Sequence, residues 1–285
     1  DILDDMIGRQ SFFIATLGAG TGFFNFKNYQ AENFITERKL ILSPSVGFFH
    51  KTGLGISATG YAVSHDKLSF YQASLTPSYD YIRPRLFSTG IGFTKYFTKN
   101  NLPFYSTPIC NEISGYFSYK RFLVQPAVAI AYGWGSRTEY EEHKTEVFLM
   151  RRFRNPRVIT VRNEESVRDL SMIFSLRHDF DFREVLYTGD AITITPVIVY
   201  SAGTQNFGLN TSFSSTSKRL NNFLPGNQFI KDKTNFDSQS VSAILRVDYS
   251  ISRFFVQSQF LVDYFLHTAD NRLNNAFAVI GGVYF

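Results

Sequence analysis

The feature that most constrains this chain is a repeated alternation of apolar and polar residues. In 253–267, one set of alternate positions holds Phe254, Val256, Phe260, Val262, Tyr264 and Leu266, and the other holds Arg253, Gln257, Gln259, Asp263 and His267. The pattern recurs in 238–249 and in 169–180. Because successive side chains of a β-strand point to opposite faces, these segments are predicted to be strands with one apolar and one polar face.

The same criterion predicts about twelve strands along the chain. They fall near 9–26, 37–50, 53–64, 68–80, 86–98, 108–119, 121–139, 167–181, 190–203, 237–250, 253–267 and 275–285. Most match or exceed the roughly nine to eleven residues with which a tilted strand crosses a bilayer. We therefore expect an all-β fold, a single antiparallel up-and-down transmembrane barrel. Counts of about 10 or 14 stay open, because the first strand is rich in glycine and 146–162 offers a further hairpin.

The links between these strands alternate between short and long. Outer-membrane barrels have short periplasmic turns and longer extracellular loops. The longest links, 140–166 and 204–236, are therefore predicted to be extracellular, and an even strand count places both chain ends in the periplasm. Residues 1–8 are expected to form a periplasmic tail or a small plug, and 9–285 the barrel. Four prolines within predicted strands, Pro44, Pro77, Pro126 and Pro196, are expected to mark bulges or places where a strand rises above the membrane.

Composition agrees with a two-faced strand protein. Aromatic residues make up 17% of the chain, yet the hydrophobic fraction is 44% and the mean hydropathy is −0.11. No stretch approaches the roughly 18 consecutive apolar residues of a transmembrane helix. The barrel interpretation requires that a secretory signal has been removed.

The net charge of +5 does not indicate a nucleic-acid partner. Nucleic-acid binders concentrate basic residues on one folded face, whereas many of these lie in the two long polar links. One such group, Arg151, Arg152, Arg154 and Arg157, is predicted to be a basic cluster of a surface loop. Solvation explains it, and so does contact with anionic outer-membrane lipid or lipopolysaccharide.

The last strand, 275–285, ends on an aromatic residue, with Phe277, Val279, Val283 and Phe285 on one face. It resembles the carboxy-terminal strand of bacterial outer-membrane proteins, in which such a pattern is recognised by the barrel assembly machinery. The resemblance implies the outer membrane of a Gram-negative bacterium and an assembly role for these four residues. The abundance of Phe, Tyr and Asn is also similar to that of Bacteroidetes proteins; the motif indicates no specific family.

The polar faces supply the candidates for a functional lumen, since inward residues tune the selectivity of such barrels. Strands two to five place mainly small uncharged residues there. The later strands contribute the lumen-lining candidates Asp169, Arg177, Asp179, Arg246, Asp248, Arg253, Gln257, Gln259 and Asp263. Charges of both signs are expected either to pair structurally or to create a selective field across a constriction.

These observations favour a pore or channel for passive passage of small solutes. A non-conducting barrel subunit of an outer-membrane assembly, secretion or uptake complex is the first alternative. A lipid-modifying hydrolase is the second, and it is disfavoured because the five histidines lie at strand ends or in loops without an evident nucleophile and orienting group. No His or Cys spacing indicates a metal site, and no cofactor is expected.

Overall fold

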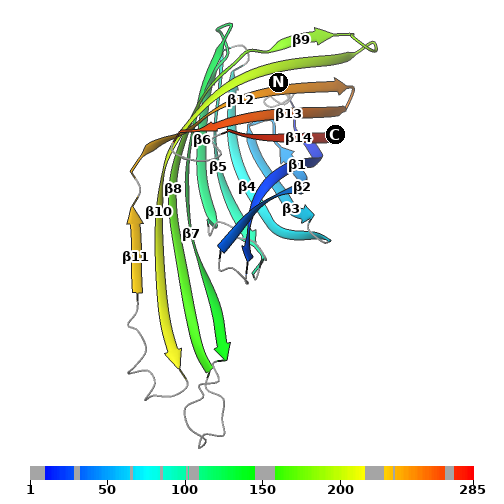
Figure 1. Ribbon diagram of the computed structural model, residues 1–285. Helices are drawn as coiled ribbons and strands as arrows, with labels where there is room; N and C mark the ends of the chain where they lie inside the picture. Colours follow the sequence, from blue (N-terminus) through cyan, green and yellow to red (C-terminus); the bar gives the residue numbers. More distant parts are fainter. Residues whose placement is uncertain are drawn as a thin grey trace, which may run out of the picture.

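In the computed structural model, the structure describes residues 10–28, 33–64, 67–83, 86–100, 102, 109–144, 158–215, 228–233, 235–266 and 273–285. This part of the chain is composed of strands and their connections (Figure 1). The strands are β1 (Phe12–Asn28), β2 (Asn33–Phe49), β3 (Leu54–Ser64), β4 (Leu68–Arg83), β5 (Phe87–Thr98), β6 (Asn111–Tyr119), β7 (Gln125–Lys144), β8 (Val158–Arg177), β9 (Phe180–Arg183), β10 (Asp190–Ser215), β11 (Gln228–Lys233), β12 (Asp237–Ile251), β13 (Phe254–Phe265) and β14 (Leu273–Tyr284).

These strands form one closed antiparallel barrel. Apart from the short strands β9 and β11, each strand pairs with the next along the chain, and β14 pairs with β1 to complete the ring. Two short strands do not add to the number of strands around the ring. β9 continues β8 along one edge of β10, and β11 precedes β12 along its other edge. The barrel is therefore twelve-stranded, which confirms the predicted fold class and strand count.

Three strands run much further than the alternation indicated. β7 and β8 pair from Gln125↔Arg177 to Lys144↔Val158, and β10 follows β8 as far as Ser215. Much of the expected loops 140–166 and 204–236 is thus strand, seen as the long arms in Figure 1. Paired strands satisfy each other's backbone groups whether or not their side chains alternate, so the ladder can continue where the sequence pattern stops. The remaining parts of these links, 145–157 and 216–227, and the predicted tail at 1–8, lie outside the described residues.

The prolines interrupt ladders without shifting their register. Pro196 faces the break between β8 and β9, and the pairs Val197↔Arg177 and Ile194↔Phe180 on either side keep one register. A missing N–H removes a ladder hydrogen bond but does not insert a residue. The described bulges lie elsewhere, at Tyr61/Ala62 in β3 and Ser201/Ala202 in β10, so a bulge at each proline was the wrong expectation.

The barrel places its large apolar residues on the outside. Phe13, Leu17, Ile91, Ile130 and Phe254 are among the exposed ones, whereas only six apolar residues of the described part are buried. A water-soluble protein buries such residues in a core, so this inverted arrangement fits a lipid-facing belt. Among the described residues, no helix is long and apolar enough to span a membrane.

Candidate functional site: the barrel lumen

The inner wall of the barrel is the candidate functional site. Strand register gives each inward residue a neighbour on the adjacent strand, so its position in the ring is fixed. Eight of the nine lumen-lining candidates are inward and partly buried: Asp169, Arg177, Asp179, Arg246, Asp248, Gln257, Gln259 and Asp263. The ninth, Arg253, lies exposed in the turn between β12 and β13, because this turn consists of Ser252 and Arg253 themselves.

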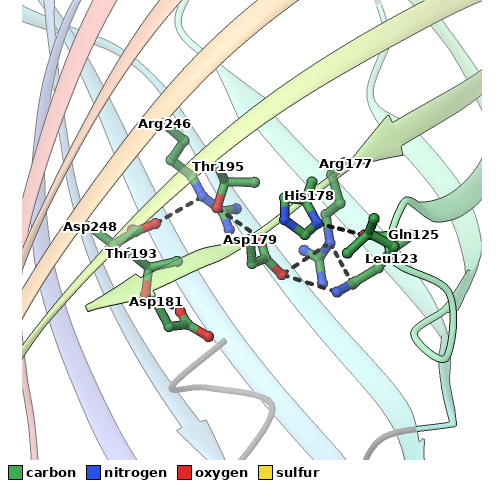
Figure 2. Close-up of polar contacts among 10 residues, drawn as sticks. All are labelled: Leu123, Gln125, Arg177, His178, Asp179, Asp181, Thr193, Thr195, Arg246 and Asp248. Carbon is green, nitrogen blue, oxygen red and sulfur yellow. Dashed lines mark hydrogen bonds and ion pairs between the residues drawn. The ribbon is translucent and has the colours of Figure 1, made fainter. Parts of the chain in front are cut away.

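Five of these candidates meet near the turn end of the barrel, the end that carries the short links between strands. They lie on β8, in the link from β8 to β9, on β12 and on β13. With Gln125 and Thr195 they form what we call the charged cluster: Gln125, Arg177, Asp179, Thr195, Arg246, Asp248 and Gln257. Figure 2 shows six of these seven residues, all but Gln257, converging on the inner wall.

Asp179 organises one half of the charged cluster (Figure 2). Its Oδ1 accepts a hydrogen bond of 2.8 Å from the hydroxyl of Thr195, a residue that is 0% exposed. Its Oδ2 accepts one of 3.3 Å from Gln125 Nε2 and lies 3.9 Å from Arg177 Nε. Arg177 Nε in turn donates to Gln125 Oε1 at 3.2 Å. The carboxylate is thus held in one position by neighbours on three strands.

Arg246 and Asp248 form the other half. Arg246 Nε lies 2.9 Å from Asp248 Oδ2, but the two groups are not aligned as a hydrogen bond, so the contact is an ion pair. Gln257 Nε2 donates to Asp248 Oδ1 at 2.5 Å, and Gln259 Nε2 donates to Gln257 Oε1 at 3.0 Å. Because Arg246 pairs with Thr195 in the ladder, the two halves lie side by side on the wall.

Two acidic candidates lie apart from the charged cluster. Asp263 accepts a 2.6 Å hydrogen bond from the Ser242 hydroxyl. Asp169 is nearer the loop end, and its buried Oδ1 has no hydrogen-bond partner. It shares a row with Glu112, because both pair with Gly133 of β7. The alternation of polar and apolar residues in the sequence had not singled out Glu112. The register of β6, β7 and β8 places the two carboxylates at the same height along the barrel axis.

Small inward side chains occur on β4 and β5, across the ring from β12 and β13, and on β7, which adjoins β8. They are Ser74, Thr76 and Ser78 of β4, Ser88, Gly90, Gly92 and Thr94 of β5, and Ala127, Ala129, Ala131 and Gly133 of β7. The three alanines are partly exposed although they face inward. A lumen filled by its own side chains would cover them, so space remains beside them.

At the loop end, one residue of the β5–β6 connection reaches the inner wall. Leu102 packs with Ile41 and Tyr71 around Val63, which is 2% exposed. Ile41 and Val63 are paired inward positions of β2 and β3. Leu102 therefore narrows the mouth of the barrel on the side of β2 to β4.

The remaining candidate residues lie outside the lumen. Phe277 and Phe285 are exposed on the closing strand, and Val279 and Val283 are partly buried beside them. Arg151, Arg152, Arg154 and Arg157 lie outside the described residues. His50 contacts the Thr52 hydroxyl, and His178 contacts the carbonyl of Leu123. The described residues contain no group of His, Cys, Asp and Glu that would hold a metal ion.

A closed antiparallel barrel with an apolar exterior and a polar inner wall defines a class, the outer-membrane β-barrel proteins of Gram-negative bacteria. No protein-family model matches this chain, and no curated protein matches it.

Solved structures resemble it at low identity. One is the RagAB peptide importer in its closed-closed state, at 7% identity and a TM-score of 0.40, covering 97% of this chain and 44% of that one. The present chain thus spans less than half the length of that relative. The translocator domain of the autotransporter NalP from Neisseria meningitidis has 9% identity and a TM-score of 0.39, covering 99% and 90%. An anion-selective porin from Comamonas acidovorans has 10% identity and a TM-score of 0.24, covering 96% and 98%.

Proposed function

We propose that this barrel is a water-filled pore for passive passage of small solutes, with the charged cluster as its selective constriction. The observation that carries the proposal is the arrangement of small and charged side chains along the inner wall. Ala127, Ala129 and Ala131 of β7 leave space beside β8, and fixed charges of both signs stand near the turn end of the barrel. Charged side chains that line a pore set which ions enter it and how readily.

The charged cluster is built to hold its charges in place. Hydrogen bonds from Thr195, Gln125 and Gln257 fix both carboxylates. Fixed charges exert a directional field on a passing ion, whereas mobile side chains adapt to it. Structural pairing and selectivity therefore coexist in one arrangement, and the paired groups lower the cost of placing charge on the barrel wall.

Swelling of proteoliposomes in uncharged sugars tests the pore directly. We expect swelling with pentoses and hexoses, and a falling rate as sugar size increases to trisaccharides. Liposomes without protein serve as the baseline. Rates equal to that baseline for every sugar, with folded protein present, would refute the pore.

The orientation that we propose places both chain ends and the short turns in the periplasm, and the long arms of β7, β8 and β10 outside. Lipopolysaccharide would then surround the arm end, and the barrel assembly machinery would insert the chain. A cysteine introduced at exposed Lys67, with Cys110 replaced by serine, tests the orientation. Labelling by a membrane-impermeant maleimide on intact cells supports it, and labelling only after cell lysis contradicts it.

One observation favours the second candidate, a subunit of a larger outer-membrane complex. Two neighbouring turns carry large exposed apolar residues: Phe122, Leu123 and Val124 after β6, and Val185, Leu186 and Tyr187 before β10. The β2–β3 turn, with His50, Lys51 and Thr52, is polar by contrast. A pull-down in detergent with Leu123→Ser and Leu186→Ser tests this candidate. Loss of a stoichiometric partner in the variant supports it, and purification of the unmodified chain alone counts against it.

A further inference from the structure

The two strands that close the barrel separate before either of them ends. The β1–β14 ladder runs from Ile14↔Tyr284 to Gly20↔Ala278. β1 nevertheless continues to Asn28 in its pairing with β2, and β14 begins at Leu273 in its pairing with β13. Residues 21–25 and 273–277 are therefore strand on both sides of a seam that has no ladder. At the other junctions of the described barrel, pairing stops where one strand ends or where a proline intervenes.

Side chains take the place of the ladder at this point. The Phe277 N–H donates to the hydroxyl of Thr21 at 3.3 Å instead of to a backbone carbonyl. Arg38 reaches across from β2, and its guanidinium donates to Thr21 Oγ1 and to Asn275 Oδ1, both at 3.1 Å. These contacts are exposed, and exposed side-chain contacts of long flexible residues are weak. The seam is thus held by a bridge that opens more easily than a strand pair.

An interrupted seam is unfavourable in a bilayer, because lipid cannot satisfy backbone N–H and C=O groups. Barrels ordinarily avoid the problem by pairing every edge. The inner wall behind this seam also has small residues, Gly20, Ala276 and Ala278, so an open seam would connect lipid with the lumen. Beside them, Asp263 and Asn274 occupy paired inward positions and offer polar groups.

We propose that the loop-end half of the β1–β14 seam is a lateral gate, through which molecules with an acyl chain and a polar head group pass between the lumen and the surrounding lipid. The chain of such a molecule fits between the strands beside Leu273 and Phe277, which are 66% and 48% exposed on the outer flank next to the polar bridge. The head group meets Asp263 and Asn274. Arg38 is a positioning residue that keeps the gate closed. This function goes beyond passive passage of water-soluble solutes along the barrel axis.

Locking the seam with a disulfide tests the gate. In a Cys110→Ser background, Thr21→Cys with Phe277→Cys joins the two strands where the ladder is missing. The matched control, Leu17→Cys with Gly281→Cys, joins them where the ladder is intact; these residues are direct ladder partners, and a side chain at 281 meets no atom within 4 Å. Both pairs occupy the same type of antiparallel position, because they are four residues apart on each strand.

The probe is a phosphatidylcholine with a diazirine on its acyl chain, in proteoliposomes, with adducts located by mass spectrometry. We expect adducts at inward Ala276 and Ala278 in the reduced protein, at least a fivefold loss after oxidation, and recovery on reduction. The control pair should leave these adducts unchanged, and Arg38→Ala should increase them. Adducts at outward Phe260 should stay constant in all variants.

Inward adducts that are absent in the reduced protein would overturn the gate, and so would equal labelling of the locked and reduced protein or a matching loss in the control pair. Sugar-driven swelling of the locked variant separates this proposal from the pore. Swelling should persist when the gate is locked. If the barrel fails to swell in any sugar, the pore is refuted, and the labelling result still tests the gate by itself.

Discussion

Phe13 and Phe285 exchange two backbone hydrogen bonds, Phe13 N–H to Phe285 O at 3.0 Å and Phe285 N–H to Phe13 O at 2.9 Å. The last residue of the chain therefore begins the ladder that closes the barrel, and its ring stays exposed on the outside. A backbone pair of this kind survives a side-chain replacement. We propose that the exposed ring of Phe285, and not its backbone, serves recognition during assembly.

We expect Phe285→Ala to lower the amount of folded barrel in outer membranes severalfold while leaving the stability of the purified barrel nearly unchanged. The reason is that the substitution keeps the Phe13–Phe285 hydrogen bonds and removes only the terminal ring. Heat-modifiable mobility on gels of outer-membrane fractions measures the folded amount. Phe254→Ala is the control, because Phe254 is outward, exposed and paired with Val283 next to the seam. An equal loss in both variants would show that general lipid contact, not the terminal position, matters.

Neutralising the acidic residues of the charged cluster should shift ion selectivity toward anions. Two unit charges about 4 Å apart interact by about 1 kcal/mol in water, which corresponds to roughly a fivefold change in relative permeability. We therefore expect Asp179→Asn with Asp248→Asn to shift the cation-to-anion ratio by about that factor. Arg177→Gln with Arg246→Gln should shift it in the opposite direction.

Reversal potentials in a salt gradient give this ratio. Arg253→Gln is the control, because Arg253 lies exposed in a turn away from the charged cluster. If Arg253→Gln changes the ion selectivity and the substitutions in the charged cluster do not, the constriction lies elsewhere.

The hydroxyl of Thr195 should stabilise the barrel more than that of Thr193. Both are on β10 and both donate to a carboxylate, Thr195 to Asp179 at 2.8 Å and Thr193 to Asp181 at 2.7 Å. Thr195 is buried, so Thr195→Val leaves a carboxylate oxygen without its donor and should cost about 1.5–3 kcal/mol. Thr193→Val, at an exposed pair, should cost less than about 1 kcal/mol. Urea unfolding in lipid measures both, and equal costs would contradict the assigned role of Thr195.

Gly53 should tolerate no side chain, although Gly189 tolerates one with a moderate penalty. Both have a positive φ, +94° and +88°, which costs a substituted residue about 1–2 kcal/mol. A Cβ on Gly53 would also lie 2.0 Å from the Asp80 carbonyl oxygen, whereas one on Gly189 meets no atom within 4 Å. The carbonyl of Gly53 accepts from Asp80 N–H at 2.8 Å, so the β2–β3 turn docks tightly on β4. Thermal unfolding should show a clearly larger loss for Gly53→Ala than for Gly189→Ala, and similar losses would contradict the close approach.

The alternation of side chains predicted the strands well because each membrane-facing residue must be apolar while its neighbour is not. It failed at the ends of β7, β8 and β10, where the sequence loses the alternation while the backbone ladder continues. It predicted which residues face inward, including Arg177 and Asp179. It did not predict which of them meet, because the Thr195–Asp179 and Glu112–Asp169 relations depend on the stagger between strands. Arg253 has the right parity but falls in the turn, which parity alone does not reveal.

Single-channel conductance in planar bilayers tests the central claim, that the barrel has an open but narrow lumen, most directly. Ala129 faces the lumen and neighbouring Ile130 faces lipid with 49% exposure, so they form a matched pair on β7. We predict uniform conductance steps for the unmodified barrel, steps reduced by about half or more in Ala129→Trp because of lost lumen cross-section, and unchanged steps in Ile130→Trp. A folded barrel that gives no steps, or equal steps in all three proteins, would contradict the account.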